Sequence, residues 1–252
     1  MGSLKKFSIS GETAEILSKG RVIGSVYYLP EITLERKQYE DVNKALVALG
    51  AKWDKKSKGH VFEYGTEEAL EKAIQTKEVV DWKKSTDFFY TPEAVVNEML
   101  GLVNQSTMGL FKMMEPSAGQ GHILDLVREN FPNAEFLVIE QNPMHCGKLR
   151  EKGYQPINAD FMEIVPCEVD IVLMNPPFTY EIEHIRHAYD FLSDGGQLIT
   201  IASGNILSKS NRKGKEFLQW FNDVGGYDYR LPQNSFKESG TSVETKMLVL
   251  EK

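Results

Sequence analysis

The residues Asn175-Pro176-Pro177-Phe178 have side chains that could bind and activate an amine. They follow an apolar run, 171–174, that is typical of a buried strand. Pro176 and Pro177 have no backbone N–H and cannot extend a strand ladder. The strand therefore ends stiffly, with the Asn175 side-chain oxygen and nearby carbonyls as acceptors beside the ring of Phe178. Such an end suits a planar group with an amino substituent. For this short motif alone, however, a turn with Phe178 in the core is the favoured interpretation, because short motifs match by chance.

A glycine-containing segment indicates a second binding element. Residues 115–121 read Glu-Pro-Ser-Ala-Gly-Gln-Gly and lie between a predicted strand and a predicted helix. Gly119 and Gly121 lack the Cβ that would keep a ligand at a distance. Leu124 stands where the dinucleotide fingerprint has its third glycine, and there is no Gly-Lys-Ser/Thr of a P-loop. A nucleoside ligand without phosphates fits this loop better than NAD does.

Acidic residues follow the next two predicted strands. Glu140 comes 19 residues after Gly121 and could accept hydrogen bonds from both ribose hydroxyls. Asp160 could accept from an adenine amino group, and Phe161 could stack on the base. Together with Asn175, these residues end consecutive parallel strands, which is where the binding crevice of an open α/β sheet forms.

The order of the predicted elements indicates an α/β fold. From residue 89 onward, strands alternate with helices, which predicts a mostly parallel sheet covered on both faces. The last two strands, with no helix between them, should form an antiparallel hairpin at one edge. The predicted strands are 110–114, 135–139, 155–157, 170–174, 196–201, 227–231 and 246–250. The predicted helices are 92–103, 121–127, 143–152, 182–192 and 215–221.

Residues 1–85 are predicted to form a separate small α/β module, and residues 86–252 the main domain. The module should contain short strands from residue 7 to about residue 30, a helix over 39–49, a β-hairpin and a helix over 67–76. The hairpin tip carries Lys55, Lys56 and Lys58, which either contact phosphates or form a solvated turn. A second basic segment, with Lys209, Arg212 and Lys213, is open to the same two interpretations, and contact is the favoured one.

Composition and charge describe a globular protein. The 252 residues are 41% hydrophobic and 26% charged, and no apolar run approaches the length of a membrane span. The net charge of −7 divides into +2 over residues 1–85 and −9 over residues 86–252. The N-terminus lacks a secretory pattern, which predicts a reducing cytoplasm with Cys146 and Cys167 as free thiols. The five histidines have no zinc spacing, so no metal is predicted, and His184 and His187 are expected at the surface of a helix.

The motifs together resemble the S-adenosylmethionine-dependent amino-methyltransferases, above all the DNA adenine-N6 methyltransferases. The resemblance covers residues from about 89 to 252 and rests on 89–92 (Phe-Tyr-Thr-Pro), 115–121, Glu140, Asp160-Phe161 and 175–178. It implies a Rossmann-like class I methyltransferase fold with a mostly parallel seven-stranded sheet. The run 42–62 resembles a module that precedes such domains in phage and mobile-element methyltransferases.

The resemblance also implies roles for individual residues. Asn175 and the Pro176 carbonyl would accept hydrogens from the target amine, Pro177 would shape the turn and Phe178 would stack on the target base. Phe236 would help to hold a flipped base. S-adenosylmethionine would be bound by Phe89, Tyr90, Thr91, Pro92, Glu115, Pro116, Ser117, Ala118, Gly119, Gly121, Glu140, Gln141, Asp160, Phe161 and Asn175.

The target polymer stays open at this level. DNA is favoured, as in a restriction-modification system, while RNA adenine, cytosine N4 and a protein glutamine amide would suit the same amine site. A cofactor-binding regulator and an NAD enzyme are alternatives of a different class. Many members of the family carry a large target-recognition domain after the catalytic domain. Because the residues here end at the sheet, either residues 1–85 read the target or specificity is low.

Overall fold

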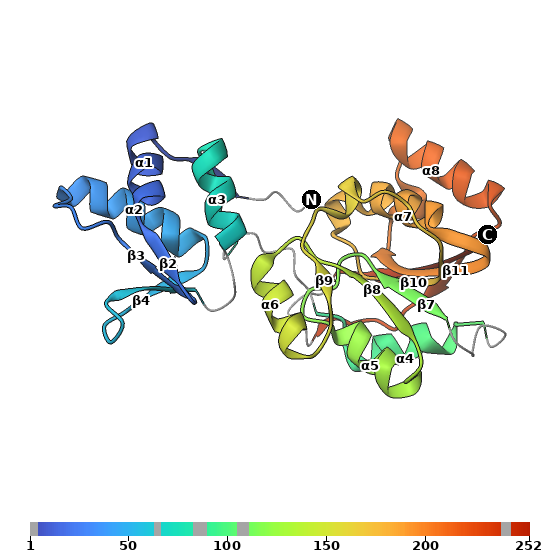
Figure 1. Ribbon diagram of the computed structural model, residues 1–252. Coiled ribbons are helices and arrows are strands. Elements are labelled where there is room, and N and C mark those ends of the chain that lie inside the picture. Colours follow the sequence, from blue (N-terminus) through green and yellow to red (C-terminus); the bar gives the residue numbers. More distant parts are fainter. Residues whose placement is uncertain (1–4, 63–66, 83–89, 105–110, 238–242) are drawn as a thin grey trace. The chain divides into compact units, whose positions relative to one another are not determined.

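The computed structural model describes residues 5–62, 67–82, 90–104, 111–237 and 243–252 (Figure 1). The chain divides into two compact units. The first comprises residues 1–87 with 142–148, and the second comprises residues 88–141 with 149–252. The predicted boundary between residues 85 and 86 lies outside the described residues and stays a prediction.

A seven-stranded sheet forms the centre of the second unit, in the order β12-β13-β11-β10-β7-β8-β9. The five strands β7 to β11 are parallel, and β13 pairs antiparallel with both β11 and β12. The predicted sheet and its C-terminal antiparallel hairpin are thereby confirmed. The strands are β7 Lys112–Glu115, β8 Glu135–Ile139, β9 Pro156–Ile157, β10 Val169–Met174, β11 Leu192–Ser203, β12 Tyr227–Arg230 and β13 Thr245–Glu251.

Helices cover both faces of this sheet, α4 and α5 on one side and α7 and α8 on the other (Figure 1). None of the helices among the described residues combines the length and the apolarity that crossing a membrane requires. The helices are α4 Glu93–Gly101, α5 His122–Asn130, α6 Pro143–Glu151, α7 Glu181–Asp190 and α8 Arg212–Asp223. Short 3-10 helices are η2 Phe161–Glu163, η3 Phe178–Tyr180 and η4 Ile206–Ser208.

Strand β10 shows how the sequence builds the core. Its apolar residues alternate between the two faces, with Ile171 and Leu173 against α4 and α5, and Val172 and Met174 against α7 and α8. All four are buried, as expected for a central parallel strand that is covered on both sides. From β7 the chain continues to β8 and β9 on one side of β7, and then crosses to form β10 on the other side of β7. The strand order therefore reverses between β7 and β10. In open α/β sheets a binding crevice forms at such a reversal.

The first unit contains a four-stranded antiparallel sheet, β2-β3-β5-β4, and a two-stranded sheet of β1 and β6. Apolar residues of its helices pack on Tyr27, Ala51 and Phe62 of the four-stranded sheet. The elements are β1 Lys6–Ser8, α1 Gly11–Lys19, β2 Arg21–Ile23, β3 Val26–Tyr28, α2 Arg36–Ala48, β4 Ala51–Asp54, β5 Gly59–Phe62, α3 Glu67–Thr76 and β6 Glu78–Val80.

The prediction of strands alone before residue 30 was wrong, because helix α1 lies between β1 and β2. Ser10 caps this helix by accepting a hydrogen bond from the Thr13 N–H at 3.0 Å, and Ile16 and Leu17 are buried. A serine at the N-cap was the available signal. The expected single strand over 21–28 is also a hairpin, which turns at Gly24 with φ +60°.

Candidate active site

Asn175 lies where β10 ends, between the buried residues 171–174 and a proline pair. Its side-chain Nδ2 donates a hydrogen bond to Thr91 Oγ1 at 3.1 Å, and Thr91 is itself buried. An amide has one NH₂ donor and one oxygen acceptor. Because the nitrogen is directed to Thr91, Oδ1 is the atom with which the Asn175 side chain can accept from an amine. Pro177 is extended with φ −61° and ψ 121°, as the sequence predicts, and Pro176 is buried.

Phe178 begins η3 directly after the prolines. Its ring is partly buried and packs against the core on the α4 and α5 side of the sheet. The ring is therefore supported by the core without being enclosed in it, which is the arrangement that stacking on a planar group requires.

The segment before α4 connects this strand end to the glycine loop. Thr91 and Pro92 are buried, and the Tyr90 ring lies 5.1 Å from the His122 ring at the start of α5. Asn175 and Thr91 are 84 positions apart in the chain, and only the fold brings them together. Phe89, the first residue of this predicted segment, lies outside the described residues.

The glycine loop after β7 is held to the end of β8. Ala118 N donates to the Ile139 carbonyl at 3.1 Å, and Gly119 N donates to Glu140 Oε2 at 2.7 Å. Gly121 has φ +81°, and a Cβ built there would approach Leu149 Cδ2 to 2.8 Å. Both the left-handed backbone and the close packing thus require glycine at this position. The turn leads directly into α5, with Pro116 buried and Ser117 partly buried at its start.

Glu115 ends β7 as a buried carboxyl group that is 3% exposed. Burial and the nearby Glu140 carboxylate raise the pKa of Glu115 well above its ordinary value, against a hydrogen bond from the Leu124 backbone that lowers it. Its Oε2 atom has no hydrogen-bond partner among the described residues. A buried polar atom without a partner is costly, and a ligand ammonium group would supply a donor and a positive charge that favour the ionised form of Glu115.

The end of β8 presents Glu140 and Gln141. Glu140 is 7% exposed and accepts from the Gly119 N–H, while Gln141 is partly exposed. Asn158, which follows β9, donates through Nδ2 to the carbonyls of both Glu140 and Gln141 at 3.0 Å each. The sequence interpretation did not assign this role to Asn158. An asparagine beside Ala159-Asp160 after a short strand was the available signal, since its two N–H donors can hold a neighbouring strand end.

Phe161 differs from its predicted arrangement, whereas the predicted role of Asp160 stays a prediction. The Asp160 carboxylate accepts from the Met162 N–H at 3.0 Å and caps η2. The Phe161 ring is only 3% exposed and packs on His187 and Phe191, at 4.7 and 5.5 Å between centroids. The predicted stacking of this ring on a cofactor base is therefore not supported, because the ring belongs to the core.

Two further side chains lie deeper than the sequence predicts. Phe236, proposed to hold a flipped base, is 2% exposed and belongs to the core. His184, expected at the surface, is 5% exposed, and burial lowers its pKa to about 4. His187 is partly buried and hydrogen-bonds to the Ile164 carbonyl. The helical spacing of the two histidines was correct, but it places them toward η2 and not toward solvent.

The basic segment of the second unit is largely engaged within the fold. Lys209 Nζ pairs with Glu181 Oε1 at 2.6 Å, and Lys213 pairs with Glu183. The Arg212 side chain is 92% exposed, and its Nε atom lies 3.6 Å from Glu216 Oε1. The favoured prediction of phosphate contact is therefore not supported for Lys209, because its charge compensates a carboxylate that is 1% exposed.

Glu181 links the segment that follows β10 to the end of β11. The sequence did not predict this link. It accepts from the Ser203 N–H at 2.7 Å and from Ser203 Oγ at 2.5 Å, in addition to Lys209. Glu181 begins α7 directly after η3, so these bonds fix the segment that carries Phe178 to the adjacent strand end. No local sequence pattern indicates the contacts of Glu181, because Ser203 lies 22 positions after it and Lys209 lies 28 positions after it.

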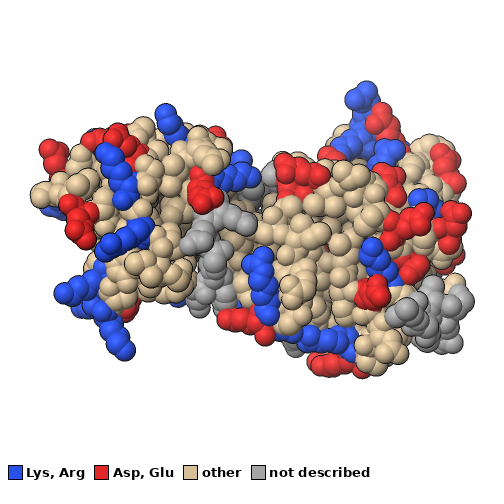
Figure 2. All heavy atoms as spheres, in the orientation of Figure 1, with Lys and Arg blue, Asp and Glu red and all other residues tan. Residues whose placement is uncertain are grey.

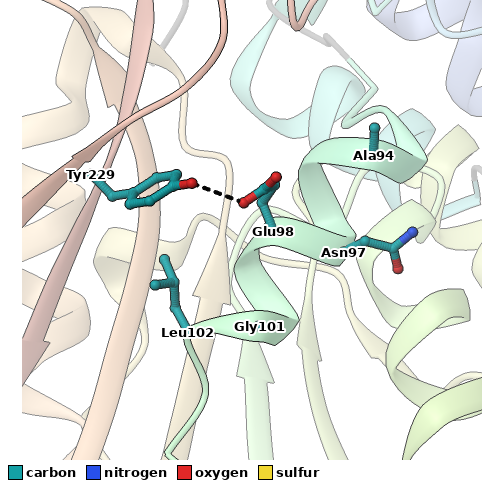
Figure 3. Close-up of a pocket in the computed structure, with 6 residues that line it drawn as sticks. All are labelled: Ala94, Asn97, Glu98, Gly101, Leu102 and Tyr229. Carbon is teal, nitrogen blue, oxygen red and sulfur yellow. Dashed lines mark hydrogen bonds between the residues drawn. The ribbon is translucent and has the colours of Figure 1, made fainter.

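A separate pocket of about 350 Å³ lies between α4 and β12 (Figure 3). Tyr229 OH donates to Glu98 Oε2 at 3.2 Å across it. Its lining contains none of the predicted site residues. The pocket is lined by Ala94, Asn97, Glu98, Gly101, Leu102 and Tyr229.

Comparisons with solved structures identify the fold. A type I restriction-modification methyltransferase subunit from Streptococcus thermophilus matches 65% of this chain and 44% of its own, with 19% identity and a TM-score of 0.58. A putative class I S-adenosylmethionine-dependent methyltransferase from Listeria monocytogenes matches 96% of this chain and 79% of its own, with 13% identity and a TM-score of 0.54. The chain has the class I methyltransferase fold. The predicted fold class is thereby confirmed.

Sequence comparison gives one relative over part of the chain. The modification methylase CviBIII of Paramecium bursaria Chlorella virus NC1A is 32% identical over an alignment of 102 positions, and the match covers 38% of this chain. The match covers 27% of the viral protein, so the methyltransferase-fold chain spans about a quarter of that relative. No protein-family model matches the chain.

Proposed function

We propose that this chain transfers a methyl group from S-adenosylmethionine to the N6 amino group of adenine in DNA. The observation that carries the proposal is the position of Asn175. Its amide is fixed by Thr91 at the carboxyl end of the central strand, next to the glycine loop and beside the ring of Phe178. The resemblance of the motifs to DNA adenine-N6 methyltransferases, and a modification methylase among the relatives, support DNA as the substrate.

The residues of the glycine loop fit the cofactor. A nucleoside ligand can approach Gly119 closely, Gly121 shapes the turn that follows it, and Glu140 lies where a ribose would be bound. The Glu115 oxygen without a partner suits the ammonium group of the methionine end. When bound, S-adenosylmethionine supplies an electrophilic methyl group on a sulfonium centre. Within this proposal, Tyr90, Thr91, Pro92, Pro116, Ser117, Ala118, Gln141 and Asp160 complete the surroundings of the cofactor.

Asn175 and Pro176 activate the amine by accepting hydrogen bonds from its two N–H groups. An aryl amine donates its lone pair into the ring and is a poor nucleophile. Acceptors at Asn175 Oδ1 and the Pro176 carbonyl favour a tetrahedral nitrogen, whose lone pair would then be free to bond to the methyl group. The methyl–sulfur bond would break, S-adenosylhomocysteine would be the leaving group, and the nitrogen would lose one proton to solvent. Positioning and fixed dipoles supply the catalysis, without a covalent intermediate on the protein.

A base within duplex DNA must leave the helix to reach this strand end. Flipping it out costs a few kcal/mol. Stacking on the core-supported ring of Phe178 offsets part of that cost, and Pro177 keeps the ring at the end of a stiff turn.

The test is a transfer assay with methyl-labelled S-adenosylmethionine and separate DNA, RNA and protein substrates. We expect label in DNA, and nucleoside mass spectrometry should identify N6-methyladenine. Label in RNA or in a glutamine side chain, or N4-methylcytosine as the product, would show that the substrate is not DNA adenine. Cofactor binding without transfer to any polymer would indicate a regulatory protein and contradict the proposal.

A further inference from the structure

The β4–β5 hairpin of the first unit presents a cluster of lysines on a well-defined turn. Lys55, Lys56 and Lys58 are exposed, and no ion pair joins them to another residue in the described part of the chain. Figure 2 shows Lys and Arg side chains gathering at the tip of this hairpin. Asp54 closes the turn by accepting from the N–H and hydroxyl of Ser57, at 2.7 and 2.8 Å. The lysines therefore project from a fixed turn.

Trp53 adds an exposed aromatic ring beside these lysines. Its side chain is exposed to 47%, and its ring lies 5.1 Å from the His60 ring in an edge-on arrangement. His60 is fully buried and hydrogen-bonds to Asn43 Oδ1 of α2 at 3.0 Å. The core of the unit thus holds the edge of Trp53 in place while much of the ring faces solvent.

We infer that the β4–β5 hairpin is a DNA-contacting element, in which Lys55, Lys56 and Lys58 bind phosphates and Trp53 packs on a nucleotide between them. The inference rests on the proposed function for the choice of DNA. Residues 86–252 carry a net charge of −9, which repels DNA, whereas residues 1–85 carry +2. A catalytic region of that charge needs a cationic element to hold a polyanion. Lysines around an exposed aromatic ring provide both the charge and a stacking surface.

The charge contribution is tested with the full chain, a short fluorescein-labelled DNA duplex and anisotropy over a series of NaCl concentrations. The logarithm of the association constant falls linearly with the logarithm of the salt concentration, and each lost phosphate contact makes this negative slope less steep by about 0.9. The Lys55→Ala/Lys56→Ala/Lys58→Ala variant should therefore lose about 2.7 in slope. Lys19→Ala/Lys37→Ala/Lys72→Ala removes the same charge from α1, α2 and α3 of the same unit and should keep the wild-type slope.

Trp53 is tested in the same assay with a single-stranded DNA of the same length, because the bases of a duplex are already stacked on one another. Trp53→Ala should weaken binding about tenfold without a change in the salt slope, because the contact is uncharged. Trp53→Phe keeps an aromatic ring beside His60 and should retain most of the affinity. If Trp53→Ala bound DNA with wild-type affinity, Trp53 would not be part of the DNA contact.

The results separate this inference from the proposed function. An equal loss of slope in the two triple variants, or no loss in the hairpin variant, would overturn the hairpin as the DNA contact while methyl transfer to DNA could still be observed. If only the hairpin variant loses salt slope and the wild-type chain transfers no methyl group, the hairpin would be upheld as the DNA contact and the proposed function would be rejected. A hairpin-dependent salt slope that is observed with RNA and not with DNA would overturn DNA as the partner.

Discussion

At the scale of single residues, Glu115 and Glu140 are two neighbouring carboxyl groups in different settings. Glu140 accepts a short hydrogen bond from Gly119 N, whereas one oxygen of Glu115 has no partner among the described residues. Burial and the neighbouring charge together favour a protonated Glu115. Folding therefore favours the protonated form of Glu115 more than the unfolded chain does.

This difference predicts a pH dependence of stability. Because the folded pKa of Glu115 is raised, its contribution to stability is fully present below the ordinary value of 4.5 and is lost as the pH rises through the folded pKa. Glu115→Gln cannot ionise, so its free energy of unfolding relative to wild type should improve as the pH rises above 4.5. Urea unfolding across this range measures the difference. A difference that does not vary with pH would contradict the account, and Glu129→Gln on the exposed surface of α5 is the control.

At the scale of elements, the glycine loop and the β11 end fix the segments that carry the site. The loop depends on Gly121, whose left-handed backbone and contact with Leu149 leave no room for a side chain. The β11 end depends on Glu181, which accepts hydrogen bonds from Ser203 and Lys209. Each arrangement predicts a stability change with a matched control.

Gly121→Ala should destabilise the protein and weaken cofactor binding. The left-handed backbone costs a non-glycine residue about 1–2 kcal/mol, and the clash with Leu149 Cδ2 adds about 1–3 kcal/mol of overpacking. Gly153→Ala has φ +87° but meets nothing within 4 Å, so it should show the backbone cost alone. Chemical denaturation of both variants separates the two contributions. Equal destabilisation would show that the Leu149 contact is unimportant.

Lys209→Met should destabilise the second unit more than Lys213→Met. Removing a partner from a buried carboxylate costs about 3–5 kcal/mol when the pair is fully buried. The Lys209 side chain is 27% exposed, so we expect about 1–3 kcal/mol. Lys213 and Glu183 are 49% and 37% exposed, and their loss should cost less than about 1 kcal/mol. If Lys209→Met instead weakened DNA binding at unchanged stability, Lys209 would be a phosphate contact after all.

At the scale of the whole molecule, the sequence predicts the sheet and the strand ends well. An apolar run that stops at two prolines determines both the burial of β10 and the place of Asn175, and these are properties of neighbouring residues. Phe161 and Phe236 follow the same local rules, but only the packed core decides which way their rings face. Lys209 could not be assigned from sequence, because its partner Glu181 is 28 positions away.

Methyl transfer through Asn175 is the central claim, and one comparison tests it most directly. Wild type and Asn175→Ala are incubated with labelled S-adenosylmethionine and DNA, while cofactor affinity is measured separately by calorimetry. Removal of the amine acceptor should lower the rate of N6-methyladenine formation at saturating cofactor by about 10²–10³-fold, the usual effect of losing one fixed dipole at a reacting centre. An Asn175→Ala protein that binds the cofactor and methylates DNA at the wild-type rate would contradict the account.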